Sequence, residues 1–172
     1  PRIIKVPSAI NTDHRVLNLL LSDYEGQIHI SFGMTTKSEI ENTMNLVSKK
    51  NRLKDVVIYH CISGYPVDNK ELYIKEIYNL KSSYGEEVSA IGFSGHHKGI
   101  AVDIGAYTLG AHWFERHFTL DRTWKGTDHS ASLEPDGMRR LKRDLMAANE
   151  ALQFKPEEIL PIEKIQRDKL KK

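Results

Sequence analysis

The sequence contains one cysteine, no strong excess of charge of either sign and no long apolar run. Cys61 cannot form an internal disulfide, and a chain without disulfides is typical of a reducing compartment, so we expect a cytoplasmic location. With 25 Lys and Arg against 23 Asp and Glu, the net charge is +2, which does not indicate nucleic acid as a partner. The longest apolar stretches, such as VLNLLL, are too short to span a membrane, so no membrane partner is expected.

The 172 residues suffice for one domain with a substantial core. Short β-branched runs alternate with amphipathic stretches along the chain. Strands are predicted over 2–6, 27–31, 55–62, 88–94 and 111–118, and helices over 13–24, 36–50, 69–85, 98–110 and 135–153. Five consecutive units of a strand and a helix predict a parallel sheet. A doubly wound sheet and a piece of an eight-stranded barrel both fit this pattern.

Every predicted strand ends in polar residues. They are Lys5 and Ser8, then Ser31, then Ser63 and Tyr65, then Ser94 and His96, then Glu115 and His117. In a parallel α/β protein these strand ends gather at one mouth, although the loops there are commonly polar in any case. Because side chains alternate along a strand, Glu115 and His117 are expected on one face, as are Ser94 and His96.

His96 and His117 follow neighbouring predicted strands. Two imidazoles placed in this way can share a divalent ion and leave positions open for water or substrate. Without a carboxylate the signature is incomplete, and ordinary pocket histidines are the alternative. By alternation His97 points away from His96, so we expect it in a loop or on the surface.

Lys5 ends a strand whose other residues are mostly apolar. It is either an edge residue with a solvated ammonium group or an anchor for an anion. The hydroxyls of Ser8, Ser31 and Ser94 favour a phosphate or carboxylate guest. For Cys61 we predict a buried structural thiol, because no base stands out near it in the sequence.

The block IGFSGHHKGIAVDIGAYTLGAHWFERHFTLDRTWKGTDHSASLEP resembles the N-acetylneuraminate (sialic acid) synthase family. IIKVPS, IHISFGM and HCISGYP resemble the strand ends of that family, in the same order. The family fold is a (β/α)8 TIM barrel. The resemblance covers strands four to eight, and it implies that residues 1–155 form the C-terminal part of the barrel, about five β/α units. Residues 156–172 are then a C-terminal tail, with nothing that matches the family's antifreeze-like domain.

The resemblance implies condensation of phosphoenolpyruvate with N-acetylmannosamine or a related N-acyl hexosamine. The products would be a sialic-acid-type nonulosonic acid and phosphate. A divalent metal, Mn²⁺ or Mg²⁺, is implied on His96 and His117, which together with Asp128 are the implied catalytic residues. The implied phosphoenolpyruvate contacts are Lys5, Ser8, Ser31 and Ser94; the implied sugar contacts are Ser63, Tyr65 and Asp128. Glu115 either orients a ligand or pairs with Lys5.

One segment departs from the family pattern. KVPSAI has Pro7 and Ala9 in place of glycines, and Ile10 where an acidic residue normally contacts the sugar. A synthase of a related acid, of the legionaminic or pseudaminic type, is therefore an alternative. A third possibility is an inactive truncated barrel that acts as a scaffold. Because a partial barrel exposes sheet edges, we expect another chain, a missing segment or dimerisation to cover them, with a homodimer as the predicted assembly.

Overall fold

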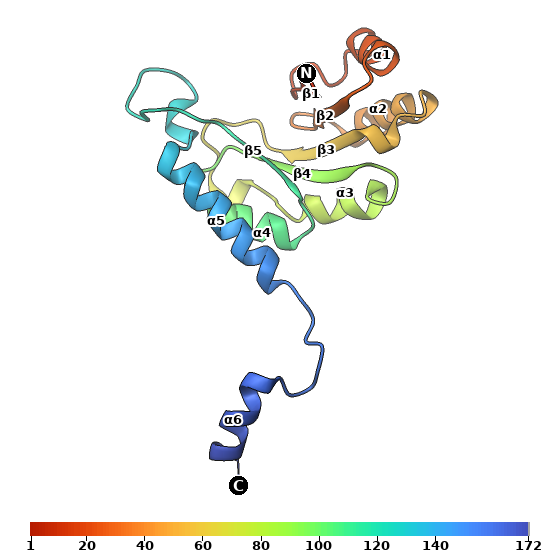
Figure 1. Cartoon of the computed structure of the whole chain (residues 1–172). Coiled ribbons are helices and arrows are strands. Elements are labelled where there is room, and N and C mark those ends of the chain that lie inside the picture. The colour runs from red at the N-terminus through yellow and green to blue at the C-terminus, as the bar shows by residue number, and fades with distance from the viewer. Residues whose placement is uncertain (172) are drawn as a thin grey trace.

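The computed structural model describes residues 1–171, in which five strands alternate with helices (Figure 1). The strands are β1 (Ile3–Val6), β2 (Gln27–Ser31), β3 (Val56–Cys61), β4 (Ala90–Gly95) and β5 (Trp113–Arg116). The helices are α1 (His14–Asp23), α2 (Lys37–Lys49), α3 (Glu76–Tyr84), α4 (Ala101–Thr108), α5 (Pro135–Ala151) and α6 (Pro161–Leu170). Short 3₁₀ turns lie at Leu53–Asp55, Asn69–Glu71 and His129–Ala131.

The five strands are parallel and hydrogen-bond in their sequence order, β1-β2-β3-β4-β5. Crossovers between parallel strands are right-handed, so a sheet whose order never reverses carries its crossover helices on one side. This is barrel winding, because a doubly wound sheet reverses its order and has helices on both faces. The protein is a parallel α/β fold that forms a curled half-barrel, as the sequence predicted in outline.

The helix-facing side of the sheet forms the hydrophobic core. Ile30, Ile58 and Phe93 point to this side and are almost completely buried against residues such as Leu17 of α1 and Ile77 of α3. Alternation places the intervening residues on the other face, which would be the inside of a complete barrel. That inner face carries Lys5, His29, Ser31, Tyr59, Ser94 and Glu115. The polar residues of interest therefore lie opposite the helices.

Side-chain caps determine where two of the loops end and the helices begin. The carboxylate of Asp13 accepts hydrogen bonds from the backbone N–H groups of Arg15 and Val16 at the start of α1. At α2 the hydroxyl of Thr36 and the side chain of Glu39 form a reciprocal capping box. These caps keep the loops after β1 and β2 short, and these loops carry Ser8 and Gly33.

The segment expected to be a C-terminal tail, residues 156–172, includes one helix. Residues Pro161–Leu170 form α6, which begins with proline in the first helical turn, a favoured position for that residue. No residue of α6 is buried, and in Figure 1 the helix stands away from the sheet at the end of an extended connection. Within residues 1–171, no helix combines the length and the apolar composition that crossing a membrane requires.

Candidate active site

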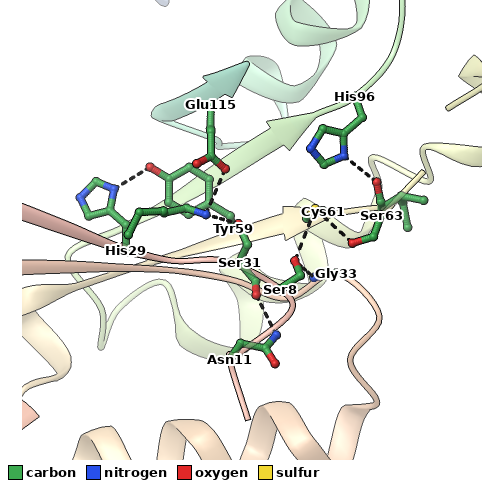
Figure 2. A network of polar contacts seen from close by, with 12 residues as sticks. Ser8, Asn11, His29, Ser31, Gly33, Tyr59, Cys61, Ser63, His96 and Glu115 are labelled. Carbon is green, nitrogen blue, oxygen red and sulfur yellow. Dashed lines mark hydrogen bonds and ion pairs between the residues drawn. The ribbon is translucent and has the colours of Figure 1, made fainter. Parts of the chain in front are cut away.

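The ammonium group of Lys5 is at the centre of the first group of polar residues. Its Nζ donates to the hydroxyl of Ser31 at 2.7 Å and lies 3.0 Å from Oε2 of Glu115. It also lies 5.2 Å from the centre of the Tyr59 ring. Figure 2 shows Glu115, Tyr59 and Ser31 converging on this point from three strands. Of the two roles considered for Glu115, the structure shows the pairing with Lys5.

Two serine hydroxyls and the sulfur of Cys61 surround the backbone of Gly33. The N–H of Gly33 donates to Oγ of Ser8 at 2.9 Å, and that hydroxyl donates to the sulfur of Cys61 at 3.7 Å. A Cβ atom at position 33 would lie 2.3 Å from Oγ of Ser63 and 2.7 Å from Oγ of Ser8, so the close approach requires glycine here. Cys61 is buried, as predicted. Ammonium and hydroxyl donors gathered in this way suit an anion.

The rings of His96 and His117 are neighbours, as the sequence predicted. Their centroids are 5.1 Å apart, with the ring planes inclined at 60°. The last paired residues of β4 and β5 are Gly95 and Arg116, so the next residue of each strand turns its side chain to the inner face. The ring of Tyr65 lies 4.4 Å from the His96 ring and 5.5 Å from the His117 ring, centre to centre.

Burial and local contacts favour the neutral form of both histidines, which is the form that binds a metal. Nδ1 of His96 lies 2.8 Å from the carbonyl oxygen of Ile62. Because a carbonyl can only accept, Nδ1 carries the proton, which leaves the Nε2 lone pair available. Burial lowers the pKa of His96. Burial, and then the proximity of His96, lowers the pKa of His117, so both rings favour the neutral form.

The donor set around the two rings fits part of a metal site. Oδ2 of Asp128 lies 3.6 Å from Nδ1 of His117, and both side chains are partly exposed. In residues 1–171, no three His, Cys, Asp or Glu side chains cluster as metal ligands would. Two neutral imidazoles could therefore supply two ligands and leave other positions to water or substrate.

The remaining predicted residue, Ser94, joins the two groups. It is buried on β4 and is paired in register with Cys61 of β3 and Glu115 of β5. It therefore lies between the Lys5 group and the His96 group on the inner face. The structure thus gathers the residues predicted from the sequence at one end of one sheet face.

Residues 1–156 match the NeuB family. The chain belongs to the NeuB family. It is 36% identical over 143 residues to the human N-acetylneuraminate-9-phosphate synthase, which covers 83% of this chain and 39% of that protein. It is 32% identical over 152 residues to the N,N'-diacetyllegionaminic acid synthase of Campylobacter jejuni, which covers 88% of this chain and 44% of that protein. The chain thus spans less than half the length of these two relatives.

A solved structure supports the same membership. The N-acetylneuraminic acid synthetase of Leptospira borgpetersenii, determined in complex with citrate, superposes with a TM-score of 0.84 at 30% sequence identity. The match covers 98% of this chain and 58% of that one. The homologues of this NeuB-family chain are thus synthases of sialic-acid-type sugars, and its fold is part of the fold they share.

His97 of the NeuB-family chain does lie past the end of β4, but it is not on the surface, and that part of the prediction was wrong. Its side chain is fully buried, with 0% exposure. Alternation did place it opposite His96, but the outer face of β4 is covered by α4 rather than by solvent. There it lies 3.2 Å from the carboxylate of Asp103 and close to Arg116.

The sequence did not single out three aromatic residues beneath Lys5. Nδ1 of His29 lies 2.7 Å from the hydroxyl of Tyr59, and the His29 ring meets Trp113 edge-on at 4.7 Å. Burial raises the pKa of Tyr59 far above its ordinary value, so its hydroxyl stays protonated. His29 was expected to be structural, which agrees with this packing. Alternation along the strands places His29 and Tyr59 on the same sheet face as Ser31 and Lys5, and this pattern would have identified the aromatic layer from the sequence.

A groove of 830 Å³ continues from this layer along β5 to α5. Its lining includes Lys5, Trp113 and Glu115 from the strands and Leu145 and Met146 from α5. In this NeuB-family chain the groove follows the edge of β5 that carries no further strand among residues 1–171.

Proposed function

We propose that this chain forms the catalytic part of a nonulosonic acid synthase that condenses phosphoenolpyruvate with N-acetylmannosamine or a related N-acyl hexosamine. One observation carries the proposal: Lys5, bonded to the hydroxyl of Ser31, shares a sheet face with two adjacent neutral histidines. An anion site beside a potential metal site suits a reaction between a phosphorylated enol and an aldehyde. We also infer that β1 to β5 correspond to the last five strands of the family barrel.

Lys5, Ser8, Ser31 and Ser94 are the proposed contacts of phosphoenolpyruvate. The ammonium group and the hydroxyls can donate to its phosphate and carboxylate oxygens. Glu115 holds Lys5 by an ion pair at 3.0 Å, so the ammonium group is oriented toward the inner face. In the proposed complex, Glu115 limits the movement of Lys5 while the anion takes up the remaining donor positions.

Asp128, Tyr65 and Ser63 are the proposed contacts of the sugar. A new bond joins the methylene carbon of phosphoenolpyruvate to the aldehyde carbon, water adds to the adjacent cationic carbon, and phosphate leaves. Mn²⁺ or Mg²⁺ on His96 and His117 would supply Lewis-acid polarisation of the aldehyde oxygen. Asp128, 3.6 Å from His117 and partly exposed, can exchange protons between the sugar and solvent.

Ile10 favours a second candidate substrate. It is 40% exposed in the loop after β1, where the family pattern has an acidic residue. An apolar side chain cannot accept hydrogen bonds from sugar hydroxyls, so a sugar with more acylated amino groups fits this side better. A synthase of the legionaminic or pseudaminic type is therefore the alternative. The intact Lys5 and histidine groups argue against an inactive scaffold.

Phosphate release tests the proposal. The full polypeptide that carries this sequence is incubated with phosphoenolpyruvate, Mn²⁺ and one sugar at a time: N-acetylmannosamine, its 6-phosphate, or a diacetamido hexose. We expect phosphate release that depends on one of these sugars and stops when EDTA removes the metal. His96→Ala should abolish it, whereas His14→Ala, an exposed histidine of α1, should not. Wild-type protein that releases no phosphate with any of the three sugars would contradict the proposal.

A further inference from the structure

A buried charged cluster lies behind the two histidines, on the helix-facing side of the sheet. It consists of His97, Asp103 in the first turn of α4, and Arg116 at the end of β5. His97 and Asp103 have 0% exposure and Arg116 has 9%. The carboxylate oxygen Oδ2 of Asp103 lies 2.5 Å from Nη1 of Arg116 and 3.2 Å from Nε2 of His97. No step proposed above uses these three side chains.

Arg116 links two strands beyond the point where their backbone pairing ends. The paired residues of β4 and β5 end at Gly95 and Arg116. Past that point, Nη2 of Arg116 donates to the carbonyl oxygen of His97 at 2.6 Å, and Nη1 donates to that of Gly99 at 3.0 Å. The guanidinium group therefore connects the end of β5 to the segment that follows β4.

Each end of this link is the covalent neighbour of a ring in the candidate metal pair. His97 follows His96, and Arg116 precedes His117, so the outer link and the inner rings share the same backbone. Other contacts hold each histidine separately: the N–H of Val67 donates to the His96 carbonyl at 3.1 Å, and that of Leu133 donates to the His117 carbonyl at 2.8 Å. Arg116 joins the two backbones to each other.

The cluster is better suited to fixing the positions of the groups it bonds than to stabilising the fold. Burial lowers the pKa of Arg116, and the carboxylate of Asp103 opposes this effect. Part of the attraction between the two side chains therefore only offsets the cost of burying the guanidinium charge. Buried ion pairs often add little net stability compared with apolar side chains of the same size. A planar guanidinium with donors in fixed directions does, however, hold several acceptors in one arrangement.

We propose that Arg116, oriented by Asp103 and His97, is a positioning residue that sets the spacing of the His96 and His117 rings. The expected effect of Arg116 on metal binding and turnover rests on the proposed function, whereas its effect on the ring spacing does not. Arg116→Lys tests the positioning role, because lysine keeps the positive charge beside Asp103 but cannot donate to both carbonyl groups in the fixed directions of a guanidinium.

The decisive measurement is the nuclear Overhauser effect between the two imidazole rings in the full chain, labelled at histidine and free of metal. With centroids 5.1 Å apart, the wild-type rings should give a detectable signal. Arg116→Lys should reduce this signal by more than half. It should also weaken Mn²⁺ binding, followed by titration, by about 10- to 100-fold, the usual effect of losing a residue that orients metal ligands.

Val47→Ala is the matched control. Val47 is a fully buried core residue of α2, whereas the cluster belongs to α4, β5 and the segment after β4, so Val47→Ala should lower the melting temperature and leave the inter-ring signal intact. If Arg116→Lys does not fold, Asp103→Asn decides, with the same loss of signal expected. An unchanged inter-ring signal in the folded variant, or no signal in the wild type, would overturn the proposal. A wild type that shows the signal but binds no Mn²⁺ would refute the metal site alone.

Discussion

Lys5 has polar partners that hold it in place and donor capacity that is still available. It donates to Ser31, pairs with Glu115 and keeps about a quarter of its side chain exposed. Lys5→Ala should raise the KM for phosphoenolpyruvate far more than that for the sugar. A lost charge-assisted contact costs about 1.5–3 kcal/mol, equivalent to roughly a 10- to 150-fold increase in KM. Steady-state phosphate release with each substrate varied in turn measures both constants.

The control for that measurement is Lys50→Ala. Lys50 is exposed and donates to Ser22 on the far side of the fold, so neither KM should change. Equal increases in both constants for Lys5→Ala would show that Lys5 supports the sheet and does not bind the anion.

Four histidines make the free energy of unfolding depend on pH. Burial is the largest cause of the lowered pKa of His29, His60, His96 and His117, whose ordinary value is 6.5. As pH falls below 6.5 the unfolded chain takes up protons that the folded chain excludes, so the free energy of unfolding falls. The decline continues until the pH reaches the folded pKa values. Denaturant unfolding at pH 7.5, 6.5 and 5.5 should show it.

His60→Gln isolates one of these contributions. Nε2 of His60 donates to the carbonyl of Leu72 at 2.7 Å, and a glutamine amide can keep that bond without titrating. The slope of unfolding free energy against pH should decrease by at most about 1.4 kcal/mol per pH unit, the value for one proton. A slope identical to that of the wild type would mean that the folded chain protonates His60 as readily as the unfolded chain does.

At the scale of elements, strands were predicted well because burial and alternation are local in sequence. The predicted 27–31 coincides with β2, and 55–62 and 88–94 differ from β3 and β4 by a few terminal residues. The fifth strand was predicted too long: after Arg116 backbone pairing passes to a bridge between Phe118 and Leu133. That partner comes from a loop, which periodicity cannot identify.

The candidate site was likewise predicted only in part from the sequence. Polarity at strand ends and parity predicted that His96 and His117 would meet, and the resemblance added Asp128. Neither revealed the buried role of His97, because that role depends on Arg116 and Asp103, which come together only when α4 packs on the sheet. α6 was missed for a different reason: none of its residues is buried, so no core-facing pattern marks it.

The substitution Gly92→Ala tests the packing between β3 and β4. An added Cβ would lie 2.5 Å from two ring carbons of Tyr59, so the ring must move away from β4. Tyr59 lies under Lys5 and bonds to His29, so Gly92→Ala should lower the melting temperature and also raise the KM for phosphoenolpyruvate. Differential scanning calorimetry and the phosphate assay provide the two values. Lower stability with an unchanged KM would show that Tyr59 does not support the anion site.

At the scale of the whole molecule, the sheet is open at both sides. β1 and β5 each pair with one neighbour in the part of the chain that the structure describes, and unpaired strand edges favour association. The groove along β5 adds apolar surface from Trp113, Leu145 and Met146. Further strands would close these edges in the proposed barrel, and a second copy of the chain is the other candidate to cover them.

We therefore expect the chain to form a dimer through the groove beside β5. Met146 is 54% exposed within the groove, and Leu152 is 52% exposed outside it, just after α5. Met146→Lys should shift the mass measured by light scattering after gel filtration from dimer toward monomer, because an ammonium group would have to be buried at the contact. Leu152→Lys, which adds the same charge at similar exposure, should leave the dimer intact. A wild-type chain that remains monomeric at tens of micromolar, or equal effects of the two substitutions, would exclude this groove as the contact.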